Sequence, residues 1–165
     1  GQEIKPYHGD APLQAFGFWL GEAHPAYQIL QDRLPRVRKP YAWYLRVPDL
    51  PTFIRHIAPA LEKRLAGSLL AGHSGELKIS FYSDGLRLVF ENGRLAAVET
   101  YRPTPHGHSG DAGFPRLTFL QLLFGYRSLE ELRYAFADCW SRSDEVTTLL
   151  NILFPRQPSN LWPVS

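Results

Sequence analysis

Two short dipeptides, Asp84-Gly85 and Asn92-Gly93, divide residues 76–101 into segments in which apolar and polar residues alternate. Dipeptides of this kind favour type I′ hairpin turns, because both central residues of that turn need a positive φ. The segment therefore predicts an antiparallel meander of three strands. A meander with one apolar face needs a cover, so the rest of the chain is expected to supply helices that pack on it.

Two-residue turns also predict the register of both hairpins. The first turn places Phe81 opposite Leu88, and the second places Phe90 opposite Leu95 and Leu88 opposite Ala97. A slip of one residue would turn the apolar face to water, so the agreement between the two registers supports both turns. The predicted apolar face consists of Leu77, Ile79, Phe81, Leu88, Phe90, Leu95 and Ala97, and continues through Glu99 and Tyr101. The predicted polar face consists of Lys78, Ser80, Tyr82, Arg87, Glu91 and Arg94.

A long amphipathic helix is predicted to precede the meander. Asp49 is its expected N-cap, Pro59 should kink it, and Gly67 should end it. Its apolar stripe is Leu50, Phe53, Ile54, Ile57, Ala58, Leu61 and Leu65. We expect Phe53, Ile57 and Leu61 to pack on the apolar face of the meander.

Further elements are predicted on both sides of this pair. Alternation over residues 41–47 indicates a strand, and short helices are expected over about 26–34 and over 115–124. Ser128 with Glu131 forms a capping box for the next helix, and Ser143 caps another. The predicted fold class is therefore α+β, with a mostly antiparallel sheet covered by helices.

Length and composition limit the number of domains and the classes of function that the chain can have. The 165 residues, 44% of them hydrophobic, suffice for one good core. We expect residues 1–40, rich in Pro and Gly, to form an extended lead-in that docks on a body formed by residues 41–165. Since the chain starts with glycine and contains no methionine, we expect it to be a piece of a larger protein.

The same numbers exclude several classes of function. A net charge of +2 implies no general affinity for nucleic acid, and no apolar stretch is long enough to span a bilayer. The basic run Arg36, Arg38 and Lys39 adjoins aromatic residues, which core packing explains without RNA. A single cysteine, Cys139, excludes an intramolecular disulfide and fits a cytoplasmic protein.

No catalytic motif stands out from residue types and spacing. His106, His108 and Asp111 could share a metal, but the loop has no third strong ligand at a tight spacing, so we expect no metal there. His56 has no identifiable partner for general-base chemistry, and Cys139 reads better as an inert residue than as a nucleophile.

An apolar pocket and a filled core remain alternatives for the interior. A helix packed on a meander, with the apolar helix 115–124 beside it, suits either one, and we favour the filled core. The candidate pocket residues are Phe53, Ile57, Leu88, Phe90, Leu117, Leu120 and Phe124.

Several separated segments resemble one protein family. They are Pro-Tyr-Ala-Trp-Tyr-Leu-Arg-Val-Pro-Asp at 40–49, and the segments at 53–62, 75–82, 119–131, 154–155 and 162–163. Together they resemble the C-terminal part of bacterial acetyltransferases of the GNAT superfamily, of the enhanced-intracellular-survival type. These enzymes carry a sterol-carrier-protein-type-2-like domain at the C-terminus. The resemblance covers about residues 15–165.

The resemblance implies a sterol-carrier-protein-like fold and a non-catalytic accessory role, in which the domain shapes the acceptor-substrate pocket and supports assembly. In the family, acetyl-CoA binds to N-terminal GNAT domains, whose Gln/Arg-x-x-Gly-x-Gly/Ala loop is absent from this sequence. The chain is thus expected to hold no cofactor of its own, while its parent enzyme uses acetyl-CoA.

The resemblance also implies partners and one catalytic group. The partners are the GNAT domains of the same polypeptide, a small amine or apolar ligand, and further copies in a homo-oligomer. The terminal carboxylate, here that of Ser165, acts as a base in the family, although this tail lacks the family's final aromatic residue. The alternative is a free-standing carrier of apolar, lipid- or sterol-like ligands.

Overall fold

A computed structural model describes residues 24–30, 33, 45–104 and 109–158. The chain divides into two compact units, Gly1–Val37 with Ser159–Ser165, and Arg38–Pro158. In the first unit the structure describes helix α1 (Pro25–Ile29), which is shorter than the helix predicted over 26–34 and begins at the N-cap His24. The expectation that residues 1–40 dock on the body falls mostly outside the described residues. Everything below concerns the second unit.

The second unit contains a five-stranded sheet in the order β3-β2-β1-β4-β5. The bounds are β1 Gly75–Ser80, β2 Gly85–Glu91, β3 Arg94–Tyr101, β4 Ala112–Gly113 and β5 Trp140–Ser141. Strands β1 and β4 are parallel and the other neighbours are antiparallel, which confirms an α+β fold with a mostly antiparallel sheet. The strand predicted over 41–47 is not found in its described part, since residues 45–47 are irregular.

The first hairpin differs from its predicted register. Ser80 pairs with Gly85, so four residues instead of two form the loop, and the predicted pairing of Phe81 with Leu88 is wrong. The loop closes through the Phe81 N–H, which donates to the Asp84 carbonyl at 2.8 Å. Tyr82, with φ +70°, takes the left-handed position that was assigned to the Asp-Gly pair. The shift in register is even, so the strand residues Leu77, Ile79, Leu88 and Phe90 stay on the predicted apolar face.

The second hairpin has the predicted two-residue turn, and Phe90 pairs with Leu95. A bulge then shifts β3 by one residue, so Leu88 lies opposite Val98 and not opposite Ala97. The predicted positions of Ala97, Glu99 and Tyr101 on the apolar face are therefore wrong. Val98 is buried instead, and Glu99 lies opposite Arg87 on the outer face.

The predicted long helix consists of two helices, α2 (Leu50–His56) and α3 (Ala58–Ala66), separated at Ile57. Pro59 lies in the first turn of α3, where its missing N–H removes no helical hydrogen bond. The predicted interruption of the helix near this proline is thus confirmed, and it takes the form of a break between two helices. Asp49 is the N-cap of α2 and its Oδ1 accepts from the Thr52 N–H at 3.0 Å.

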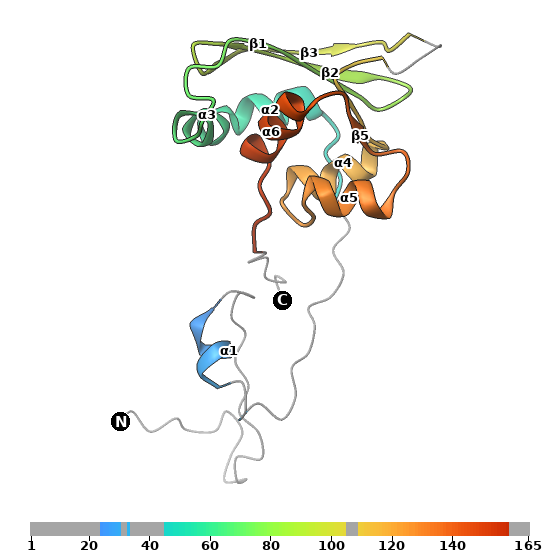
Figure 1. Cartoon of the computed structure of the whole chain (residues 1–165). Coiled ribbons are helices and arrows are strands. Elements are labelled where there is room, and N and C mark those ends of the chain that lie inside the picture. The colour runs from blue at the N-terminus through green and yellow to red at the C-terminus, as the bar shows by residue number, and fades with distance from the viewer. Residues whose placement is uncertain (1–23, 31–32, 34–44, 105–108, 159–165) are drawn as a thin grey trace, which may run out of the picture. The chain divides into compact units, whose positions relative to one another are not determined.

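Three more helices complete the unit, α4 (Arg116–Leu123), α5 (Leu129–Ala135) and α6 (Asp144–Leu153). The capping box of α5 is confirmed, because the Ser128 Oγ accepts from the Glu131 N–H and the Glu131 carboxylate accepts from the Ser128 N–H. Ser143 caps α6 as predicted. Figure 1 shows α2, α3 and α6 beneath one face of the meander, with α4 and α5 farther from it.

The core between sheet and helices is filled with aromatic and aliphatic side chains. Phe119 of α4 contacts three other rings, those of Phe81, Phe114 and Phe154, at centroid distances of 5.3, 5.7 and 5.7 Å. Leu61 of α3 is fully buried in the same cluster, whereas Ile57 is only partly buried. The described helices thus close one face of the sheet.

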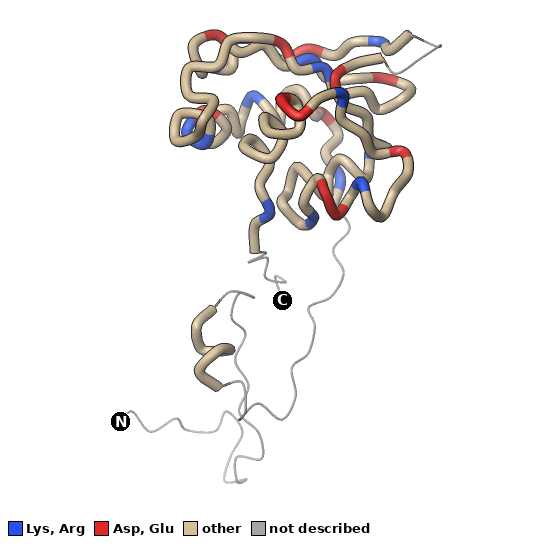
Figure 2. Tube along the Cα trace, viewed as in Figure 1, with Lys and Arg blue, Asp and Glu red and all other residues tan. Residues whose placement is uncertain are grey.

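The outer face of the sheet carries charge (Figure 2). Arg87 pairs with Glu76 and with Glu99, and Lys78 lies 3.2 Å from the Glu76 carboxylate. Hydrogen bonds from Arg87 and then Lys78 lower the pKa of Glu76 to about 2. The outer face of the sheet is therefore a charged, solvated surface, and the grooves of the unit lie on its helical side.

Candidate functional site

A groove on the surface of the helical side is the best candidate site. Its volume is about 350 Å³, and it lies between the segment that enters α2 and the start of α4. It is lined by Arg46, Val47, Pro48, Leu50, Arg116, Leu117 and Leu120. Apolar side chains thus form most of its wall, and two guanidinium groups provide the charge.

Local sequence explains how each wall is held. Leu50, the first residue of α2, is 2% exposed, so it anchors the entering segment in the core. Phe114 is fully buried just before α4, and Pro115 is the N-cap of that helix. Leu120 is 9% exposed, whereas Leu117 is 57% exposed and accessible from the groove.

Two arginines line the groove, and one of them, Arg116, is paired with a carboxylate outside the lining. The Arg116 Nη1 donates to the Asp84 Oδ2 at 2.8 Å, and Asp84 in turn accepts from the Ser83 Oγ at 3.2 Å. The first turn of α4 adds the positive end of a helix dipole, and no side chain caps it. None of the lining residues in the described part of the chain is acidic. The groove is therefore suited to a negatively charged group.

A second groove is larger and more open, with a volume of about 630 Å³. It is lined by Gly67, Ser68, Leu69, Thr148, Asn151 and Ile152. None of these described lining residues carries a charge, so this surface offers only the neutral hydrogen-bonding groups of Ser68, Thr148 and Asn151.

The predicted pocket residues fall into three environments. Leu117 and Leu120 line the groove described above. Leu88 and Phe90 are 0% and 1% exposed and lie in the packed interior. Neither of the two grooves lies between sheet and helices, which agrees with the filled core that the sequence favours.

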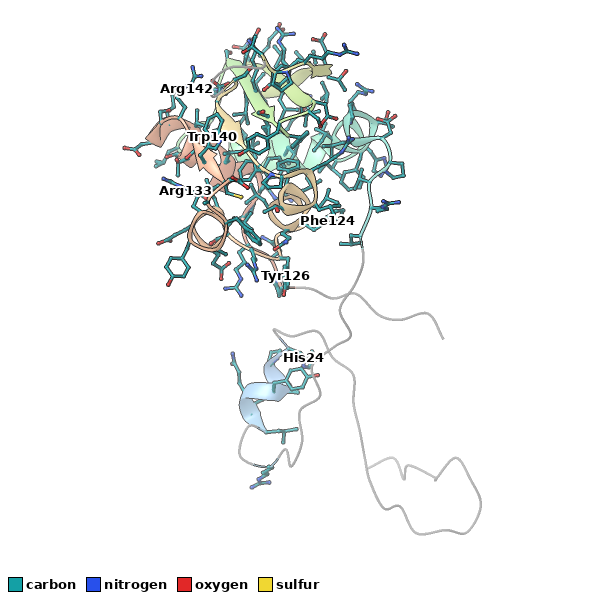
Figure 3. The ribbon with its side chains drawn as sticks, turned by 90° about the vertical axis from the view of Figure 1, so that its right-hand side faces the viewer. His24, Phe124, Tyr126, Arg133, Trp140 and Arg142 are labelled. Atoms are coloured by element: carbon teal, nitrogen blue, oxygen red, sulfur yellow. The ribbon has the colours of Figure 1, made fainter. Side chains whose placement is uncertain are left out.

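The third environment is a partly exposed aromatic edge. The rings of Phe53 and Phe124 are 5.5 Å apart, and Ile57 packs partly buried against the same core. Figure 3 shows Phe124 and Tyr126 on the helical side, away from the sheet. Phe53 therefore turns toward the end of α4, while its neighbour Ile54 is the residue of α2 that is fully buried.

The residues considered for metal or nucleophilic chemistry are placed as follows. The Asp111 Oδ2 accepts from the Lys78 N–H at 2.8 Å, so this carboxylate holds the sheet together. His106, His108 and Ser165 lie outside the described residues. Among the described residues, no group of three or more His, Cys, Asp or Glu side chains could hold a metal ion.

Cys139 is buried, and burial, followed by the nearby charge of Asp138, raises the pKa of its thiol to about 11. A thiol with that pKa is almost wholly protonated at neutral pH and is a poor nucleophile. His56 ends α2 and is exposed to solvent.

Sequence reasoning missed the two arginines of the groove. Arg46 and Arg116 are far apart in the chain, and only the folded structure places them along one groove. One signal was present, since Arg116 is the first residue of a helix that is apolar on most sides. A charged residue at that position lies at a surface edge of an otherwise buried element.

Fold and groove together define an α+β protein with a filled core and a groove at its surface. No family model, no curated protein and no solved structure matches the chain. Among the described residues, no helix is both long enough and apolar enough to cross a membrane.

Proposed function

We propose that this chain is a non-catalytic accessory domain of a GNAT-type N-acetyltransferase, with a sterol-carrier-protein-like fold, which helps to shape the acceptor pocket and the assembly. The observation that carries the proposal is the combination of a filled core with one mixed apolar and guanidinium groove at the surface. Such a surface provides a wall, away from the reacting amino group, for a site that another domain completes. The family resemblance in the sequence supplies the identity of that domain.

The placement of the groove supports this role. Arg46, Val47 and Pro48 belong to the segment through which the chain enters the second unit. The segment that leads into α2 and the segment that follows α6 leave the unit on its helical side, away from the meander (Figure 1). The groove is therefore next to the covalent connection between this unit and the preceding residues of the chain.

The proposal assigns acetyl-CoA and catalysis to the preceding GNAT domains. The single cysteine and its reduced, buried state accord with a cytoplasmic location.

Calorimetric titration of this chain with acetyl-CoA tests the proposal, and we expect no binding. Micromolar binding would show that the coenzyme site lies in this chain. The open reading frame at the native locus provides an independent test, because the proposal requires a GNAT domain upstream in the same polypeptide.

The carrier of apolar ligands is the alternative function. It requires an interior cavity, yet the described interior is filled at Leu88, Phe90 and Phe119. We therefore expect a fluorescent sterol or a long-chain acyl probe to show no saturable binding to the chain. Saturation at one equivalent would favour the carrier over the accessory domain.

A further inference from the structure

We propose that the groove between the entry to α2 and the start of α4 binds a small oxyanion, a carboxylate or a phosphate, that carries a compact apolar group. This is a binding property of the chain itself and does not rest on the activity proposed for the parent enzyme. It concerns the surface groove and not the interior between sheet and helices.

The size and lining of the groove determine how large the apolar group of the ligand can be. A volume of about 350 Å³ lies near the lower end of the range for small-molecule sites, roughly 300–1,000 Å³. Val47, Leu50, Leu117 and Leu120 provide apolar contacts from both walls. A compact group, such as one fused aromatic ring system, fits this space better than a long acyl chain or a sterol.

Arg116 sets the charge of the ligand. Its guanidinium presents N–H donors in a planar fork that matches the oxygens of carboxylates and phosphates. The contact with Asp84 is made through Nη1, and it holds the side chain in place from the β1–β2 loop. The side chain remains 51% exposed, so a ligand in the groove can reach it.

The same charges disfavour an amine. Arg46 and Arg116 both line the groove, and no described lining residue is acidic. The nearby Asp84 carboxylate is already engaged by Arg116, so a cationic ligand would meet like charges and find no acidic lining residue to compensate for its lost hydration. An oxyanion with the same apolar group meets the complementary charge.

Heteronuclear NMR titration of the whole chain tests the charge preference. The probes are 2-naphthoate, 2-naphthyl phosphate and the cation 2-naphthylmethylammonium, which share one ring system. We expect at least one anion to saturate and to bind at least about tenfold more tightly than the cation, since a charge-assisted hydrogen bond contributes at least that factor. Equal binding of the cation, or no saturation by either anion at millimolar concentration, would overturn the proposal.

Inorganic phosphate and acetate form the second arm of this experiment. They carry the oxyanion without the ring, and we expect them to bind much more weakly than the naphthyl compounds. If they bind equally well, the apolar wall contributes nothing and the proposed ligand class is wrong. A stronger response to the phosphate or to the carboxylate identifies which oxyanion the groove prefers.

Matched variants locate the site. We expect Arg116→Gln to weaken anion binding about tenfold or more, and Leu117→Ser, at an exposed wall position, to weaken it severalfold. Arg133→Gln and Tyr134→Ser on α5 remove the same kinds of group outside the groove and should leave binding unchanged. Arg46→Gln provides a second test of the charge if Arg116→Gln does not fold. Unchanged binding in every groove variant would place the site elsewhere and overturn the proposal.

Discussion

Replacement of Leu88 by alanine tests the arrangement of the sheet most directly. Leu88 lies on β2, pairs with Leu77 on one side and Val98 on the other, and is 0% exposed. The hydrogen-bonded strands on both sides prevent the backbone from collapsing into the space that the lost atoms leave. Large-to-small changes at such sites cost about 3–5 kcal/mol, which combines the lost transfer free energy with that of the cavity.

Arg87 is the matched control, because it precedes Leu88 on the same strand and faces the other way. Its partners Glu76 and Glu99 are at least 42% exposed, and exposed ion pairs contribute little to stability. We therefore expect Arg87→Ala to destabilise the protein far less than Leu88→Ala.

Urea unfolding followed by far-ultraviolet circular dichroism measures both losses. For a protein of this size the slope is roughly 1–3 kcal/mol per molar urea, so Leu88→Ala should lower the midpoint by about 1 M or more. An equal or larger decrease for Arg87→Ala would mean that the apolar face of the meander has been assigned to the wrong side.

Three further outcomes follow from single sites. Gly125→Ala should lower the free energy of unfolding by about 1–3 kcal/mol in urea melts, because the φ of Gly125 is +67° and an added Cβ would lie 2.8 Å from backbone atoms. Gly67→Ala is the control and should be close to neutral, because the backbone atom nearest to its added Cβ is 3.6 Å away. Cys139, with its pKa raised to about 11, should react with a thiol reagent at pH 8 many times more slowly in the native than in the unfolded chain, and equal rates would contradict its burial. Because Arg87 lowers the pKa of Glu76 from 4.5 to about 2, this carboxylate stabilises the fold above pH 4.5 and loses that effect as the pH falls toward 2. Glu76→Gln should therefore make the urea midpoint less dependent on pH in this acid range at low salt.

Local signals in the sequence predicted the ends of helices correctly. Asp49, Ser128 with Glu131, and Ser143 each cap the helix that was expected to follow them. The Asn92-Gly93 turn was also correct. These features depend on hydrogen bonds and φ values within a few residues, so they can be inferred without knowledge of the rest of the fold.

The register of the first hairpin could not be predicted from local sequence. Gly85 was assigned to a tight turn, but in the structure it begins β2, and the ring of Tyr101 lies where its Cβ would be, with 2.2 Å between them. The glycine is therefore needed for a contact across the sheet, which a dipeptide pattern cannot report. The bulge at Val89 and Phe90 is a similar case, because it depends on how β3 fits β2.

The sequence by itself determined the fold class, the helix caps and the faces of β1 and β2, because period and capping are properties of short segments, whereas the bulge changed the face of β3 beyond Leu95. Tertiary structure alone decided that the two-residue strands β4 and β5 join the sheet, since segments of that length are held by their pairing partners and carry no periodic signal. It also decided that the interior is filled and that Arg46 and Arg116 line one groove. The groove depends on which distant segments pack together, and that is settled by the burial of the whole core and not by any local pattern.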